Sequence, residues 1–218
     1  MRNLGELTLN LSFYLYLVFY LPQLWRNFRC NDITNLSLGF HSLLFIGATA
    51  DLFYGFGRIQ QWQYRVISLT MFLCVLVQHV HFCWHARRVS RGKMYLTLLS
   101  LLVFVLLVLL FFVLAGRQHY FIGSALGWVE RIAYWFYSVP QLIKNKERQD
   151  ASSLSPYFLV LAVLTALCDS VSAWTLSWGP SSLYGAPLAL LVHLILLYQW
   201  CNFRKTSQRQ NSDTLQYT

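Results

Sequence analysis

Long apolar runs alternate with short polar or basic connections along the whole chain. Seven runs are long enough to cross a bilayer as a helix, which takes about 20 apolar residues. They cover residues 7–25, 36–57, 64–86, 94–115, 121–143, 154–176 and 181–202. The pattern therefore predicts an all-α membrane protein with seven transmembrane helices.

Composition supports the membrane class. Of the 218 residues, 56% are hydrophobic, 17% are aromatic and 11% are charged, whereas a soluble domain carries about 25% charged residues. This composition excludes a soluble globular fold, a disordered chain, a coiled coil and a disulfide scaffold. No two of the five cysteines form a CxxC pair, so we expect them to be small packing residues.

The net charge of +9 is explained by orientation in a bilayer rather than by a nucleic-acid partner. Twelve Lys and Arg residues follow the first, third, fifth and seventh runs, four lie on the opposite side, and Arg131 lies within a run. Basic residues accumulate in cytoplasmic loops. We therefore expect the N-terminus to be lumenal or external and the C-terminus to be cytoplasmic.

Two segments match each other at an offset of 118 residues. Residues 16–51 and 134–169 align without a gap and are identical at 12 of 36 positions. The shared positions include Pro-Gln-Leu at 22–24 and 140–142, and the pair Asp51 and Asp169. A gapless match that includes an acidic residue inside an apolar run indicates an internal duplication.

The duplication predicts the architecture. Each copy covers about three spans, so directly joined copies would face opposite ways in the membrane. The fourth run restores the direction, and it is almost pure Leu, Val and Phe. We predict two parallel three-helix bundles joined by a linker helix, 3+1+3, related by an axis along the membrane normal. The first repeat would cover 1–90, the linker 91–118, the second repeat 119–203 and a cytoplasmic tail 204–218.

Two Pro-Gln-Leu motifs near the cytoplasmic ends of the first and fifth runs resemble the PQ-loop repeat family. That family includes cystinosin and the lysosomal cationic amino acid exporters, and it is more distantly related to the SWEET sugar carriers. The resemblance covers nearly the whole chain and implies a carrier in a lysosomal or vacuolar membrane. A bacterial inner membrane fits the same charge bias, and a related receptor for escaped endoplasmic reticulum proteins uses the same fold without transport.

The duplicated prolines are candidate hinges. A proline inside a helix removes a backbone donor and produces a kink, so Pro22 and Pro140 could act as paired hinges for alternating access. Gln23 and Gln141 supply amides that could satisfy the freed carbonyls or contact a solute. The alternative is that each proline only marks the end of a span.

The duplicated acids are candidate proton-coupling groups. An ionisable residue inside a span costs about 3 kcal/mol or more on insertion scales, so its presence there indicates a function. Asp51 and Asp169 could load a proton from an acidic compartment and release it to the cytoplasm. The cystinosin branch uses an Asp of its second repeat in this way, and the resemblance therefore points to Asp169. The alternative is a structural hydrogen bond between helices, or a pair with a cation such as Arg131.

Other polar residues are candidates for the same cavity. Glu130 shares a helix face with Tyr134 and Tyr137, which makes it a second candidate for binding a proton or a substrate ammonium group. A structural ion pair is the alternative for Glu130. Further candidates for lining the substrate cavity are Asn35, His41 and Tyr54.

These observations predict a proton-coupled secondary transporter. We expect it to move a small polar solute, most plausibly an amino acid such as cystine or a cationic amino acid, from the lumen or exterior to the cytoplasm. Its partners would be the solute, protons and the lipid bilayer. The alternatives are a SWEET-like sugar facilitator and a non-transporting receptor or trafficking factor. No enzyme motif occurs in the sequence, and we expect no cofactor and no metal site.

Overall fold

The computed structural model describes residues 2–30, 36–88, 92–114, 116–177 and 180–216. Within these ranges the chain is helical apart from short turns and contains no strand. The elements of the first half are α1 (Arg2–Val18), α2 (Leu21–Cys30), α3 (Leu38–Gly57) and α4 (Trp62–Arg88). The next is α5 (Gly92–Leu114), the linker. The elements of the second half are the 3-10 turn η1 (Gly116–Gln118), α6 (His119–Phe136), α7 (Val139–Arg148), α8 (Pro156–Thr175) and α9 (Pro180–Gln216).

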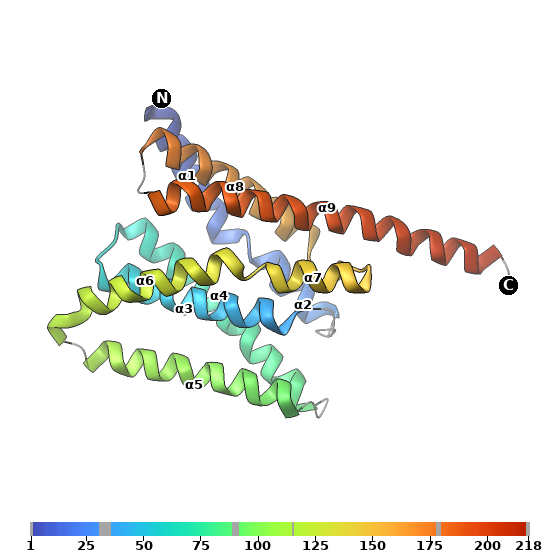
Figure 1. The fold of residues 1–218 in the computed structure, drawn as a ribbon, viewed down its shortest axis with the longest axis horizontal. Helices are drawn as coiled ribbons and strands as arrows, with labels where there is room; N and C mark the ends of the chain where they lie inside the picture. Colours follow the sequence, from blue (N-terminus) through green and yellow to red (C-terminus); the bar gives the residue numbers. More distant parts are fainter. Residues whose placement is uncertain (1, 31–35, 89–91, 115, 178–179, 217–218) are drawn as a thin grey trace.

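These elements form the expected seven-helix 3+1+3 membrane fold over the described residues (Figure 1). The pairs α1–α2 and α6–α7 are each one interrupted span. Five segments of the described chain are long and apolar enough to cross a membrane by themselves: α1–α2, α4, α5, α8 and the first part of α9. The remaining two spans, α3 and α6–α7, are not among these five segments. In α3, twelve of 20 residues are buried against other helices, so its composition does not have to match lipid.

The most extensive helix–helix contacts join one repeat to the other. Helix α1 packs on α8, and α6 packs along α3, so the first helix of each repeat lies on the second helix of the other. Close approach marks both contacts. A Cβ atom at Gly5 would lie 2.2 Å from Thr175 Oγ1, and one at Gly123 would lie 3.0 Å from Gly57 Cα. Residues 5 and 123, and residues 57 and 175, are related by the offset of 118, so the packing has the pseudosymmetry that the sequence predicts.

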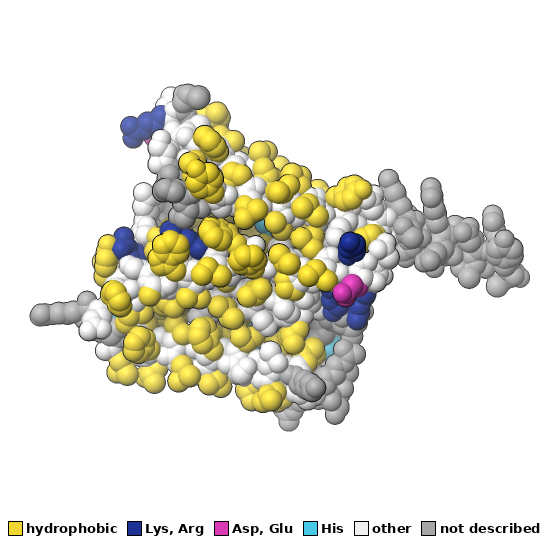
Figure 2. Space-filling model, viewed as in Figure 1, with side chains coloured by type: hydrophobic (Ala, Val, Ile, Leu, Met, Phe, Trp, Pro, Cys, Tyr) yellow, Lys and Arg dark blue, Asp and Glu magenta, His cyan; other side chains and the backbone are white. Residues whose placement is uncertain are grey.

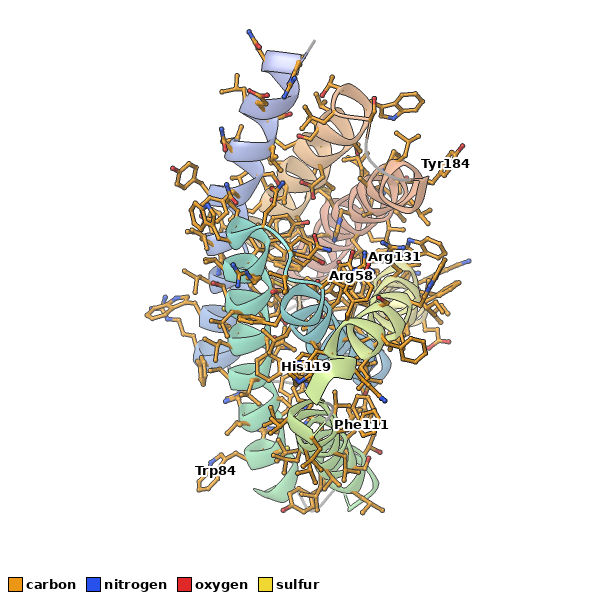
Figure 3. The ribbon with its side chains drawn as sticks, turned by 90° about the vertical axis from the view of Figure 1, so that its left-hand side faces the viewer. Arg58, Trp84, Phe111, His119, Arg131 and Tyr184 are labelled. Atoms are coloured by element: carbon orange, nitrogen blue, oxygen red, sulfur yellow. The ribbon has the colours of Figure 1, made fainter. Side chains whose placement is uncertain are left out.

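The outer surface suits a bilayer. Figure 2 shows hydrophobic side chains over most of the visible middle of the molecule, with Lys and Arg toward its ends. Trp84 and Tyr184 project away from the helices (Figure 3), with 55% and 71% of their surfaces exposed. The linker α5 also exposes many of its apolar side chains. Helix α9 continues to Gln216 and so includes most of the segment 204–218 that the sequence predicts to be a cytoplasmic tail.

Candidate functional site

A cavity of about 290 Å³ lies between the two repeats. Side chains from α1, α3, α4, α6, α8 and α9 form its wall. The wall is mostly apolar, with a small set of polar groups, as is usual for small-molecule sites. Three carboxyls are among its ionisable and hydroxyl groups. The residues that carry all of these groups are Ser12, Tyr16, Tyr20, Asp51, Tyr64, Glu130, Tyr134, Tyr137, Thr165, Asp169 and His193.

The Asp169 carboxyl is held by hydroxyl groups of the other repeat. Ser12 Oγ donates to Asp169 Oδ1, and the Tyr16 hydroxyl donates to Asp169 Oδ2 at 2.7 Å. Ser12 and Tyr16 are one helical turn apart on α1 and therefore share the face that packs on α8. Both carboxyl oxygens thus have a donor across the repeat interface.

The Asp51 carboxyl has different surroundings. The Tyr64 hydroxyl of α4 donates to Asp51 Oδ1, so this bond stays within the first repeat. Glu130 on α6 lies close enough to act on Asp51 electrostatically. Asp51 is 6% exposed, and it follows the start of α3 at Ser37 by 14 residues. At 1.5 Å per residue, this places the carboxyl about 21 Å along the helix from that end.

None of the three carboxyls forms an ion pair with another residue that the structure describes. Within the described ranges the ion pair that occurs is Arg2 with Glu6, at 3.1 Å on the surface. Arg131 does not counter either aspartate, because its guanidinium lies over the Trp128 ring, 5.5 Å from the centroid. Figure 3 labels Arg131, which belongs to α6.

Each Pro-Gln motif begins a new helix after an interruption. Helix α1 ends at Val18 and α2 begins at Leu21, and in the same way α6 ends at Phe136 and α7 begins at Val139. Pro22 and Pro140 are therefore each the second residue of a helix. A proline there loses no helical hydrogen bond, because the first amides of a helix have no partner within it. The motif thus starts a separately oriented segment rather than bending a continuous helix.

The two glutamine side chains bind reciprocally across the repeats. Gln23 Oε1 accepts from the backbone N–H of Ser155 at 2.8 Å, and Gln141 Oε1 accepts from that of Ser37 at 2.7 Å. Ser155 and Ser37 are the N-cap residues of α8 and α3. We refer to these two contacts as the glutamine clasp.

The amide nitrogens of the clasp complete the same network. Gln23 Nε2 donates to Asn27 Oδ1 at 2.9 Å, and Gln141 Nε2 donates to Asn145 Oδ1 at 2.6 Å. Gln23 Nε2 also donates to the Ser153 carbonyl at 3.1 Å, across the repeats. Both glutamines are fully buried, so the clasp closes this end of the bundle.

An aromatic layer separates the cavity from the clasp. It consists of Phe19, Phe40, Tyr137 and Phe158, which form two contacts related by the offset of 118. The rings of Phe19 and Phe158 are 5.5 Å apart, and those of Phe40 and Tyr137 are 5.3 Å apart. Each contact joins the first span of one repeat to the second helix of the other. The cavity is therefore closed on the Pro-Gln side by two pseudosymmetric layers.

A model of the PQ loop repeat matches residues 4–64 and 122–182, which together make up more than half of the chain. The chain belongs to the PQ-loop repeat family. Its structure is also similar to one described as that of a eukaryotic SWEET transporter at 3.7 Å resolution. The TM-score is 0.63 at 12% identity, over 93% of this chain and 99% of the other. No curated protein matches the chain in sequence.

In this PQ-loop protein, several of the residues expected at the site lie together. Asp51, Glu130, Tyr134, Tyr137 and Asp169 all line the cavity. The four residues of the Pro-Gln motifs lie beyond the aromatic layer, and their glutamines form the clasp instead of facing the cavity.

Three other candidates lie elsewhere or cannot be placed. His41 does not line the cavity. Its Nε2 is 2.8 Å from Nδ1 of His79, whose Nε2 contacts the Leu98 carbonyl of the linker at 2.8 Å. Tyr54 packs on Gly127, and its hydroxyl accepts from Gln60. Asn35 is outside the described residues.

The sequence interpretation missed Ser12, Tyr16, Tyr64 and His193. A signal existed for the first two, because Tyr16 matches Tyr134 in the repeat, and extending the match by one turn pairs Ser12 with Glu130. The third helices carry no comparable repeat signal, and Tyr64 and His193 belong to these helices. His193 Nε2 lies 2.7 Å from the Tyr137 hydroxyl.

Proposed function

We propose that this PQ-loop protein is a proton-coupled secondary transporter of a small polar solute. The solute would be an amino acid, either cystine or a cationic amino acid, carried from the lumen or exterior into the cytoplasm by alternating access. The observation that carries this proposal is a central cavity between pseudosymmetric repeats, lined by three carboxyls and closed at the Pro-Gln end.

The closed end supports alternating access. The clasp and the aromatic layer join the first span of each repeat to the second helix of the other. Relative motion of the repeats therefore has to break both pseudosymmetric sets of contacts together. Rocking of one bundle against another opens a gate in this way. The interruptions before Pro22 and Pro140 supply points where the end segments can turn. In this proposal the Pro-Gln side faces the cytoplasm.

The chemistry of the cavity supports an amino group in the substrate. Asp51, Glu130 and Asp169 can bind an ammonium group or protons, and the tyrosine rings can contact a cation through their faces. Buried carboxyls are not needed for passive movement of a neutral sugar. Asp169, Asp51 and Glu130 are thus the residues that we propose to bind the coupling proton or the ammonium group of the substrate.

Uptake into liposomes tests this function. The purified protein would be reconstituted, and labelled L-cystine, L-lysine, L-arginine and D-glucose would each be offered with and without an acidic exterior. We expect uptake of an amino acid that an inward proton gradient stimulates. Glucose flux that is indifferent to pH would favour a SWEET-like facilitator, and binding without flux would favour a receptor.

The variant Asp169→Asn tests the carboxyl that the resemblance points to. We expect acid-stimulated uptake to fall to the level of protein-free liposomes, with unchanged protein abundance in the membrane. Asn keeps the shape of the side chain but cannot carry its charge or a dissociable proton. The matched control is Glu6→Gln on the exposed surface, which should transport normally. Full coupling in Asp169→Asn would remove this residue from the mechanism.

A further inference from the structure

Among the pairs of equivalent cavity residues that carry a carboxyl group, one pair differs between the two halves of the cavity. The offset of 118 relates Asp51 to Asp169 and Tyr16 to Tyr134, and it relates Ser12 to Glu130. All six residues line the cavity. The second-repeat aspartate contacts a serine of the packed helix, whereas the residue equivalent to that serine in the other half is a glutamate, which lines the same cavity as Asp51.

The half of the cavity that contains Ser12 and Asp169 suits an ionised carboxylate. Ser12 and Tyr16 donate hydrogen bonds to the two oxygens of Asp169. Hydroxyl donors stabilise the charged form of a carboxyl group and require it to accept. These two donors therefore favour the charged form of Asp169 without a cation.

The half of the cavity that contains Glu130 and Asp51 does not suit two negative charges. A carboxyl in place of the Ser12 hydroxyl cannot donate to Asp51 unless it carries a proton. The hydrogen bond to Asp51 comes instead from Tyr64. Two carboxylates that share a site in a low-dielectric environment cannot both be ionised at low cost, so one of them retains a proton.

No cation forms an ion pair with this half within the described residues, although the charge of Arg131 acts on Glu130. The titratable and charged groups that face or flank the pair from the packed helices are Tyr16, Arg58, Tyr64, Arg131, Tyr134, Asp169 and His193. Arg58 donates to Ser124 Oγ and lies 3.9 Å from the centre of the Tyr120 ring. The guanidinium of Arg131 lies over Trp128. Neither arginine forms an ion pair with a carboxyl within the described ranges.

We infer that Asp51 and Glu130 hold one proton between them, and that this pair is the proton-carrying group while Asp169 remains an ionised counter-charge for the substrate. The role of the pair in transport rests on the proposed function. The shared proton itself does not, because it is argued from the position of both carboxyls on the wall of one cavity and from the cost of two like charges there. The resemblance pointed to Asp169 as the proton carrier, and the asymmetry of the cavity favours the other half.

Infrared spectroscopy of the purified protein in lipid nanodiscs tests the shared proton without any substrate. A protonated carboxyl gives a C=O stretching band that an ionised carboxylate lacks. We expect this band at neutral pH in the wild-type protein. Glu130→Gln and Asp51→Asn should each remove it, because either change deletes the like charge that retains the proton. Asp169→Asn, the matched control, should keep it.

A second variant separates loss of the proton from misfolding. Glu130→Ser introduces the residue type of the equivalent position, Ser12, so this variant should fold. It should also lack the C=O stretching band of a protonated carboxyl. Helix content and elution as a single species verify folding of each variant. No band in the wild type, survival of the band in either pair variant, or its loss in Asp169→Asn would overturn the inference.

Transport then assigns the role of the pair. Glu130→Gln should retain exchange of labelled for unlabelled substrate but lose stimulation by an acidic exterior, whereas Asp169→Asn should lose both. If the wild type transports none of the solutes offered, the proposed function fails while the infrared result stands. If Glu130→Gln remains stimulated by acid, the function stands and the pair is not the coupling group.

Discussion

Removing one half of the glutamine clasp should loosen the other half. Gln23→Ala deletes the two hydrogen bonds that Gln23 makes across the repeats, to the Ser155 amide and the Ser153 carbonyl. At about 1 kcal/mol net for each bond, the closed state loses about 2 kcal/mol relative to an open state in which water replaces both. With 1.4 kcal/mol per factor of ten, the open fraction rises about 30-fold.

Hydrogen–deuterium exchange at the remote amide measures this change. The amide of Ser37 binds Gln141, which the substitution does not touch. If both halves of the clasp open in one motion, exchange at Ser37 should accelerate about 30-fold in Gln23→Ala. Gln61→Ala, at an exposed glutamine outside the clasp, serves as the control and should leave exchange unchanged. Acceleration at Ser155 alone would show that the two glutamines are independent helix caps, and the argument for a single gate would fail.

Two further predictions concern packing. Gly57→Ala should lower the free energy of unfolding by about 1–3 kcal/mol, because its Cβ would lie 2.7 Å from the backbone carbonyl oxygen of His119. Gly92→Ala, with open space around it, is the control, and equal thermal stability of the two variants would contradict the close packing. His79→Ala should speed exchange in α5, because it deletes the hydrogen bond that joins α4 to the Leu98 carbonyl, at a cost of about 1 kcal/mol. The same acceleration in His85→Ala would mean that the histidine pair does not anchor the linker.

The sequence predicted the fold because its signals are local or repeated. Apolar length defines a span whatever its neighbours are. The offset match at Pro22 and Pro140, and at Asp51 and Asp169, relates the two halves without knowledge of any contact. These two signals were sufficient for the seven-helix layout. The same match, extended by one turn, already pairs Ser12 with Glu130, which is the asymmetry on which the shared proton depends.

The partners of these side chains could not be predicted in the same way. In a membrane protein, the lipid-facing and core-facing sides of a helix are both apolar, so hydropathy does not give the rotation of a helix. His41 illustrates this, since its position in an apolar run fits the cavity and the linker contact equally well. Its rotation toward His79 became visible only in the packed structure.

The sequence by itself determined that this is a membrane protein of two like-facing repeats with duplicated Pro-Gln motifs and acids, because length, composition and repetition are properties of the chain alone. The tertiary structure decided that Gln23 binds the helix of the other repeat, that Asp169 meets two hydroxyls and that Asp51 shares a cavity with Glu130. Those pairings depend on how helices far apart in the sequence cross and rotate against each other, and no local pattern encodes that geometry.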